Sequence, residues 1–197
     1  MRDPLLFDQL VNAKYLNEED KTCVLHSGVD GWATAISNNI LRAGKHYTTF
    51  EVSYPQGDPV TVLVGVMRPG QANKRASNIP TSKHFYNNFS RRLGHGAHNN
   101  KVHCCMYYTY GGVGYSSNWS GFDVDIIADR SWARSESMSS GGELGMLLDL
   151  DEGTLSVYKN GRKLGVMKRG LAGPYCWVVS LNQGSQVTIK RGIIPPN

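Results

Sequence analysis

The residues best suited to hold a metal ion lie near the middle of the chain: His95, His98, His103, Cys104 and Cys105. Imidazole and thiolate groups are ligands that zinc prefers, but zinc needs four of them to converge, usually from paired short spacings. A strand would point the adjacent Cys104 and Cys105 to opposite faces. We therefore expect no metal here, with the cysteines buried as small apolar side chains and the histidines in solvated loops.

Two further patterns have the residue types of a catalytic or cofactor site. Asp149 and Asp151 could project from one face of a strand, but acids beside a turn commonly accept hydrogen bonds from backbone N–H groups, so we expect them to hold the turn at Gly153. The run Gly111–Gly114 lacks the lysine and hydroxyl residue of a phosphate loop. No strand–turn–helix pattern presents a nucleophilic serine. The sequence therefore predicts no enzyme and no cofactor.

Aromatic residues cluster around the glycine run, and most are expected in the core: Tyr107, Tyr108, Tyr110, Tyr115, Trp119, Phe122 and Trp132. Tyrosine and tryptophan also dominate the binding energy of protein interfaces. Tyr115, Trp119 or Trp132 could therefore anchor a ligand.

The net charge of +5 is unevenly distributed. The stretch from Pro59 to Phe122 contains no acid, but it has these cations: Arg68, Lys74, Arg75, Lys83, Arg91, Arg92 and Lys101. Such asymmetry predicts a field that attracts an acidic partner. Single-stranded nucleic acid would exploit the same cations together with Phe85 and Phe89, although no RNA-binding motif supports that reading.

Length and composition predict a single globular domain in the cytoplasm. The chain has 197 residues, of which 40% are hydrophobic and 22 are glycine, typical of one domain with many turns. Its first residues include acids, and no stretch approaches the roughly 18 apolar residues that span a membrane. The four cysteines have no disulfide-framework spacing, which indicates thiols in a reducing compartment.

The apolar spacing predicts one short helix followed by strands. Asp3 could cap a helix that starts at Pro4 and ends near Val11. Beyond residue 22 the apolar residues alternate, and each short run rich in Val, Ile, Tyr or Thr is bounded by turn residues. The expected strands are Cys23–His26, Trp32–Ser37, His46–Ser53, Thr61–Met67, His103–Thr109, Asp123–Ile127, Leu144–Asp149, Leu155–Lys159, Tyr175–Leu181 and Gln186–Arg191.

Turns and connections complete this prediction. Asn160-Gly161 supplies the positive φ angles of a tight hairpin turn between residues 154–159 and 164–167. The long connection from Pro69 to Asn100 is of a length that is usually functional or mobile. We expect an N-terminal helical or irregular extension over residues 1–22, followed by an antiparallel β-sandwich over residues 23–197.

One long segment resembles the signature of the SPRY (B30.2-like) family. It runs from Gly142 through Leu144, Leu148 and Asp149 to Asn160-Gly161, and Gly170–Tyr175 and Val178–Leu181 continue it. Upstream, Gly44–Tyr47 resembles the entry strand of the family. The resemblance implies two curved antiparallel sheets in a concanavalin-like jelly roll. It also implies a non-catalytic adaptor that binds proteins.

In one branch of this family, loops at a rim of the sandwich bind a peptide. The matching loops here are 26–30, 56–59, 68–74 and 182–184, but Asn182 and Gln183 replace the apolar-aromatic element that lines the pocket in that branch. We expect the cations to attract acids and the polar rim residues to bind peptide backbone. The predicted partner-binding residues are Asp30, Arg68, Arg75, Arg91, Arg92, Tyr115, Trp119, Asn182 and Gln183.

The predicted partner is a peptide or another protein, and no membrane is involved. A carbohydrate-binding lectin is the alternative, because jelly-roll sheets also bind sugars and Trp119 or Tyr115 could stack on a sugar ring. Nucleic acid is a weaker alternative. Both a complete protein and one domain of a larger protein fit this pattern.

Overall fold

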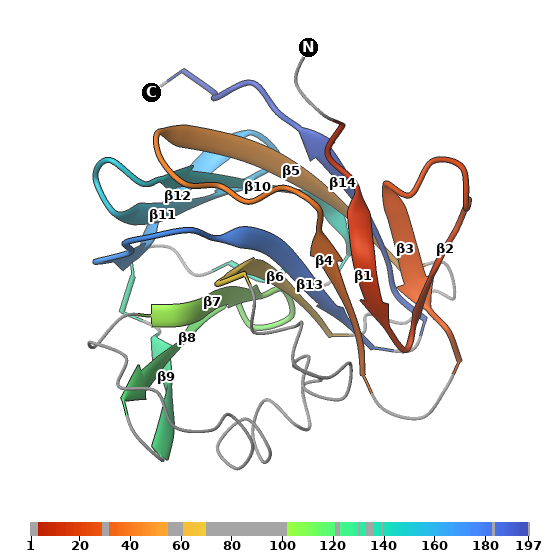
Figure 1. Cartoon of the computed structure of the whole chain (residues 1–197), viewed down its shortest axis with the longest axis horizontal. Coiled ribbons are helices and arrows are strands. Elements are labelled where there is room, and N and C mark those ends of the chain that lie inside the picture. Colours follow the sequence, from red (N-terminus) through yellow and green to blue (C-terminus); the bar gives the residue numbers. More distant parts are fainter. Residues whose placement is uncertain are drawn as a thin grey trace.

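The computed structural model describes residues 4–28, 32–54, 61–69, 102–120, 123–129, 131–132, 136–138, 140–182 and 184–196. Two seven-stranded sheets pack face to face (Figure 1). The first sheet has the order β1 (Phe7–Val11), β4 (Ala33–Ser37), β13 (Cys176–Leu181), β6 (Val62–Met67), β7 (Val102–Tyr108), β8 (Val113–Ser120) and β9 (Asp123–Asp129). The second has the order β12 (Arg162–Arg169), β11 (Thr154–Lys159), β10 (Gly142–Asp149), β5 (Lys45–Ser53), β14 (Gln186–Arg191), β3 (Cys23–His26) and β2 (Ala13–Tyr15).

Neighbouring strands in both sheets pair antiparallel, which confirms the predicted sandwich. Every strand expected from the sequence is present within a few residues of its predicted bounds. The pattern assigned no strand to the residues of β1, β2 and β8. The hairpin turn between β11 and β12 has φ angles of 49° at Asn160 and 76° at Gly161, as predicted.

The predicted N-terminal helix is wrong, and the described residues contain no helix. Phe7–Val11 forms β1, which pairs with β4 at the edge of the first sheet. The Phe7 N–H donates to the Lys21 carbonyl at 3.0 Å, and the Tyr15 hydroxyl donates to the Phe7 carbonyl at 2.8 Å. Leu5 and Phe7 are 7% and 0% exposed. These tertiary contacts outweigh a helical spacing that is only a weak local preference.

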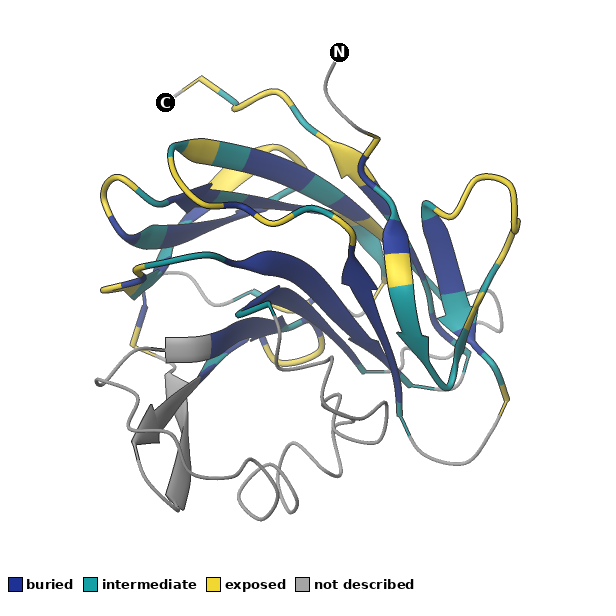
Figure 2. Cartoon of the chain, in the orientation of Figure 1, coloured by how far each residue is buried: buried dark blue, intermediate teal, exposed yellow. Residues whose placement is uncertain are grey.

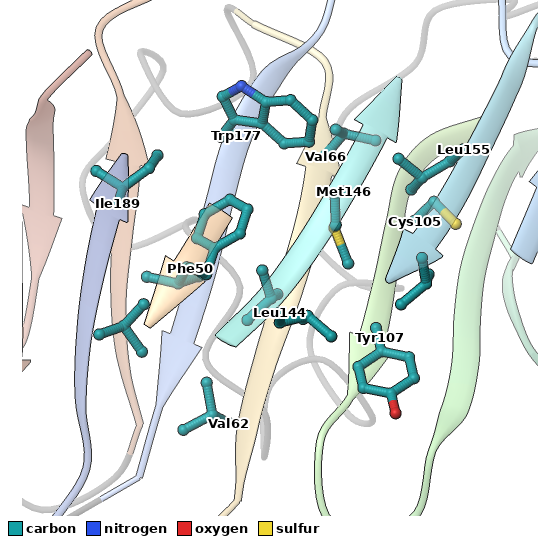
Figure 3. Packing of buried hydrophobic residues seen from close by; sticks show 14 of the residues in the cluster. Phe50, Val62, Val66, Cys105, Tyr107, Leu144, Met146, Leu155, Trp177 and Ile189 are labelled. Atoms are coloured by element: carbon teal, nitrogen blue, oxygen red, sulfur yellow. The ribbon is translucent and has the colours of Figure 1, made fainter. Parts of the chain in front are cut away.

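The main core lies between the two sheets, and the alternation predicted for residues 144–150 produces its centre. Leu144, Met146 and Leu148 are 0% exposed and point from β10 toward the first sheet. Phe50 and Trp177 meet edge to face across the two sheets, with ring centroids 5.8 Å apart. Figure 3 shows these side chains filling the space between the sheets.

The first sheet is apolar on its outer face as well. A second cluster of buried side chains lies there, and it consists of Ile36, Leu63, Met67, Cys104, Met106, Cys176 and Val178. All six residues of β6 and all six of β13 are buried, as Figure 2 shows by the dark blue of these strands. The half-buried side chains that border this cluster are Val11, Trp32, Tyr108 and Tyr115. The first sheet is therefore buried on both faces over its central strands, and half-buried aromatic rings border the cluster on its outer face.

Candidate partner-binding surface

Strand register brings several connections together at one end of the first sheet. Ala33, at the start of β4, lies opposite Leu181 at the end of β13, and Leu181 lies opposite Val62 at the start of β6. Leu63 in turn lies opposite Tyr108, the last residue of β7. Asn182 after β13, Thr61 before β6 and residues 109–112 between β7 and β8 therefore share one end of the sandwich, which we call the Asn182 end.

Hydrogen bonds hold these connections against one another. The Asn182 N–H donates to the Thr61 carbonyl at 3.2 Å. The Ser185 hydroxyl donates to the Asn182 carbonyl at 2.5 Å. The Thr61 hydroxyl oxygen lies 3.5 Å from that of Tyr108, at the outer limit of a hydrogen bond. The Asn182 end is thus fixed by the pairing of the strands and does not depend on one loop.

Three tyrosines line this end beside Thr61 and Asn182. The ring centroids of Tyr108 and Tyr115 are 6.0 Å apart, and those of Tyr108 and Tyr110 are 6.3 Å apart. Tyr110 is 52% exposed, whereas the other two are half-buried. We call Tyr108, Tyr110 and Tyr115 the tyrosine cluster. Its separations are those of favourable edge-to-face and tilted ring contacts, so the rings support one another.

The side chains of the tyrosine cluster, Thr61 and Asn182 carry no charge at neutral pH. The segment that bonds to the Thr109 carbonyl through the Met138 N–H does carry charge, because Glu136 forms ion pairs with Lys159 and Arg162. Burial is the main cause that raises the pKa of Tyr54, which lies 3.3 Å from the Thr109 hydroxyl. The other groups that act on the pKa of Tyr54 are Thr109 and Tyr108, both uncharged. The Asn182 end therefore offers aromatic rings and hydroxyl groups, with the ion-paired Glu136 in the neighbouring segment.

The structure brings together two of the predicted partner-binding residues and separates a third from them. Tyr115 and Asn182 both lie at the Asn182 end, but Arg68 follows β6 at its opposite end. Because a strand rises about 3.3 Å per residue, the length of β6 puts Arg68 about 20 Å from Asn182. The Arg68 guanidinium lies 5.3 Å from the centre of the Tyr175 ring and donates to the Ala172 carbonyl.

The other predicted residues fall outside what the structure describes. Trp119 belongs to β8, but its side chain is not among the described ones. The residues that lie wholly outside the described ranges are Asp30, Arg75, Arg91, Arg92 and Gln183. Their assignment to a binding surface stays a prediction.

Sequence reasoning missed Tyr108, Tyr110 and Thr61 as surface residues, because it expected most of the aromatic group in the core. Tyr107 does lie there, 0% exposed and in edge-to-face contact with Trp132 at 5.8 Å. Trp132, a candidate anchor, is only 7% exposed. The available signal was the strand period of two, since it directs Tyr107 inward and Tyr108 outward.

The two candidate acids stabilise turns in different ways. Asp149 Oδ1 accepts hydrogen bonds from the N–H groups of Asp151 and Glu152, both at 3.1 Å, as predicted. Asp151 Oδ1 accepts from the Gly44 N–H at 3.0 Å and so ties this turn to the start of β5. Asp149 also forms an ion pair with Lys45 at 3.1 Å.

The adjacent cysteines point to opposite faces, as expected for a strand. Cys105 belongs to the core between the sheets, and Cys104 belongs to the cluster on the outer face. His95 and His98 lie outside the described residues, as does the side chain of His103. Among the described residues, no group of three or more histidines, cysteines or acids could hold a metal ion. That part of the chain also has no helix that is long and apolar enough to cross a membrane.

A two-layer antiparallel sandwich whose strand ends form a polar and aromatic surface defines the class of this protein. The SPRY domain family matches residues 45–193, so the chain belongs to the SPRY domain family. SPRY domains are generally protein-interaction modules.

Two solved structures have the same fold. The SPRY domain of human HERC1 superposes with a TM-score of 0.61 at 16% identity, over 94% of this chain and 97% of that one. The TRIM65 PSpry domain superposes with a TM-score of 0.54 at 18% identity, over 96% of this chain and 93% of that one. None of the curated proteins matches the chain in sequence. At these identities the likeness concerns the fold alone.

Proposed function

We propose that this chain is a non-catalytic, cytoplasmic interaction module that binds a peptide or protein partner at the Asn182 end. One observation carries the proposal: partly exposed tyrosines lie beside hydrogen-bonding groups on a surface fixed by strand pairing. Tyrosine is among the residues that contribute most binding energy at interfaces. The four buried cysteine thiols support a reducing compartment.

The rigidity of this surface favours binding. β6 and β7 each have a neighbour on both sides, and the connections at their ends are bonded to one another. A surface that is already ordered loses little conformational entropy when it binds, so more of its contact energy contributes to affinity. An edge strand has a neighbour on one side only, so a surface built on it would be less ordered before binding.

Electrostatic attraction is a separate part of the proposal. Arg75, Arg91 and Arg92 belong to the acid-free stretch, and we propose that they attract an acidic region of the partner from a distance. Charges at the margin of an interface mainly raise the association rate and its dependence on salt. Arg68, at the far end of β6, belongs to this attraction and not to the contact with the tyrosine cluster.

The test captures the partner from a cell extract with the tagged chain and identifies it by mass spectrometry. Binding kinetics of the purified partner are then measured for the wild type, for Tyr110→Ala with Asn182→Ala, and for Arg91→Glu with Arg92→Glu. We expect Tyr110→Ala with Asn182→Ala to raise the dissociation rate. We expect Arg91→Glu with Arg92→Glu to lower the association rate, most strongly at low salt. Leu16→Ala is the control, because Leu16 is 59% exposed and follows β2 in the other sheet.

Each arm can fail separately. Unchanged dissociation with Tyr110→Ala and Asn182→Ala would show that the partner binds elsewhere on the sandwich. Unchanged association rate and salt dependence with the arginine reversals would remove the electrostatic part and leave the contact surface in place.

A further inference from the structure

We infer that the free edge of β9 binds an extended peptide segment by β-strand addition, and that this segment alternates cationic and apolar residues. β9 forms no part of the tyrosine cluster, so the inference goes beyond the proposed function and can fail without it. It follows from three properties of β9: its place at the end of the first sheet, its regular pairing with β8, and its residue types.

β9 is the last strand of the first sheet, and no other described strand pairs with its second side (Figure 1). All seven of its residues pair with β8, from Asp123 opposite Ser120 to Asp129 opposite Gly114, without a register shift. The side of such a strand that faces away from its neighbour presents backbone N–H and C=O groups at a regular spacing. Such a row is the template that an extended peptide uses when it adds a strand to a sheet.

The other three edge strands of the sandwich have features that hinder this kind of pairing. β2 has only three residues. The outward groups of Phe7 in β1 are occupied, because its N–H donates to the Lys21 carbonyl and its carbonyl accepts from the Tyr15 hydroxyl. β12 contains four cations, and its pairing with β11 has two register shifts. Short length, lysines and bulges are the features that protect sheet edges, and β9 has none of them.

The residue types of β9 determine which segment fits its edge. The sequence of β9 is Asp-Val-Asp-Ile-Ile-Ala-Asp, with three acids and no cation. An added strand places one residue opposite each residue of β9, and opposite charges at directly opposed positions stabilise a sheet. Lysine or arginine opposite the aspartates therefore fits best, with apolar residues at the positions between them.

The same charges disfavour a second copy of this chain at the edge. When two β9 strands pair antiparallel about Ile126, Asp123 of each copy lies opposite Asp129 of the other. Like charges at directly opposed positions destabilise the pair. β12 of a second copy is cationic, but its two register shifts interrupt the regular spacing that β9 requires. Charge and regularity together favour a segment of a different chain.

The experiment measures binding of labelled synthetic peptides to the full chain by fluorescence anisotropy. Each peptide has seven residues, the length of β9. The first peptide alternates lysine and valine, and the second alternates glutamate and valine. The third is the lysine–valine peptide with every backbone amide N-methylated, so that it keeps its charge and cannot donate backbone hydrogen bonds. We expect only the first to bind, because strand addition needs the backbone donors as well as the charge match.

Reversing the charge of β9 provides the matching change in the protein. The β9 reversal variant combines Asp123→Lys, Asp125→Lys and Asp129→Lys. We expect it to bind the lysine–valine peptide about tenfold more weakly, since each of several opposed charge pairs contributes modestly. We also expect it to bind the glutamate–valine peptide, which would show that the edge is still formed in the variant.

The matched control reverses three exposed acids in the turn after β2 and should leave binding unchanged; it combines Glu18→Lys, Glu19→Lys and Asp20→Lys. The inference is overturned if the lysine–valine peptide does not bind, if its N-methylated form binds equally well, or if the β9 reversal and the control variant lose binding equally. It is also overturned if the β9 reversal leaves binding unchanged. A wild-type dimer in sedimentation that the β9 reversal dissociates would contradict it too, because the edge would then be occupied by a second copy.

Discussion

At the scale of single residues, Asp149 has more stabilising partners than any exposed acid of the same turn. Burial acts to raise the pKa of Asp149, but hydrogen bonds from the Glu152 N–H and from Lys45 outweigh it. The pKa of Asp149 therefore lies below its ordinary value. Its role is structural, since it connects the turn after β10 to the first residue of β5.

Replacing Asp149 by alanine should lower the free energy of unfolding by about 1–3 kcal/mol at neutral pH, because two backbone N–H groups lose a charged acceptor. The native pKa of Asp149 lies below the unfolded value of about 3.9, so its contribution is complete above that pH. The contribution then disappears as the pH falls through the native pKa. Denaturant unfolding of the wild type and Asp149→Ala, repeated from neutral to acidic pH, measures the difference between their unfolding free energies, which should shrink as the pH falls.

Glu152→Gln is the matched control, since Glu152 contributes only its backbone N–H to the Asp149 interaction. It should change the unfolding free energy by less than about 0.5 kcal/mol. A gap between Asp149→Ala and the wild type that stays constant into acid would contradict the proposed role of the ionised carboxylate.

At the scale of elements, β1 shows where local sequence patterns fail. The spacing of its apolar residues is compatible with a helix. The contacts that make it a strand are to β4 and Lys21, which are distant in the sequence. By contrast, β10 and β11 were predictable because strict alternation and the Asn160-Gly161 turn act within one hairpin. Local information was sufficient where the partner strand was adjacent in sequence.

Phe7→Ala should lower the free energy of unfolding by about 3–5 kcal/mol, because Phe7 is 0% exposed in the core between the sheets. This substitution tests whether β1 contributes to the stability of the sandwich or whether residues 23–197 are stable without it. Thermal and denaturant unfolding measure the effect, with Leu16→Ala expected to be nearly neutral. A loss of less than about 1 kcal/mol for Phe7→Ala would favour the appendage.

At the scale of the whole molecule, the two ends of the first sheet have different chemistry. The Asn182 end presents tyrosines and hydroxyls, whereas the other end holds Arg68 against Tyr175 and Ala172. The sequence identified Tyr115 and Asn182 but also grouped Arg68 with them, because loop order along the chain does not reveal at which end of a strand a loop lies. That assignment requires the direction and register of β6 and its neighbours.

Hydrogen exchange of the chain with and without its captured partner tests the central claim, which is that the Asn182 end is the recognition surface. We expect slower exchange in the partner-bound chain around residues 108–115 and 182–185, with no change around Arg68 or Ala172. Protection confined to the outer face of the second sheet, or to the Arg68 end, would contradict the account.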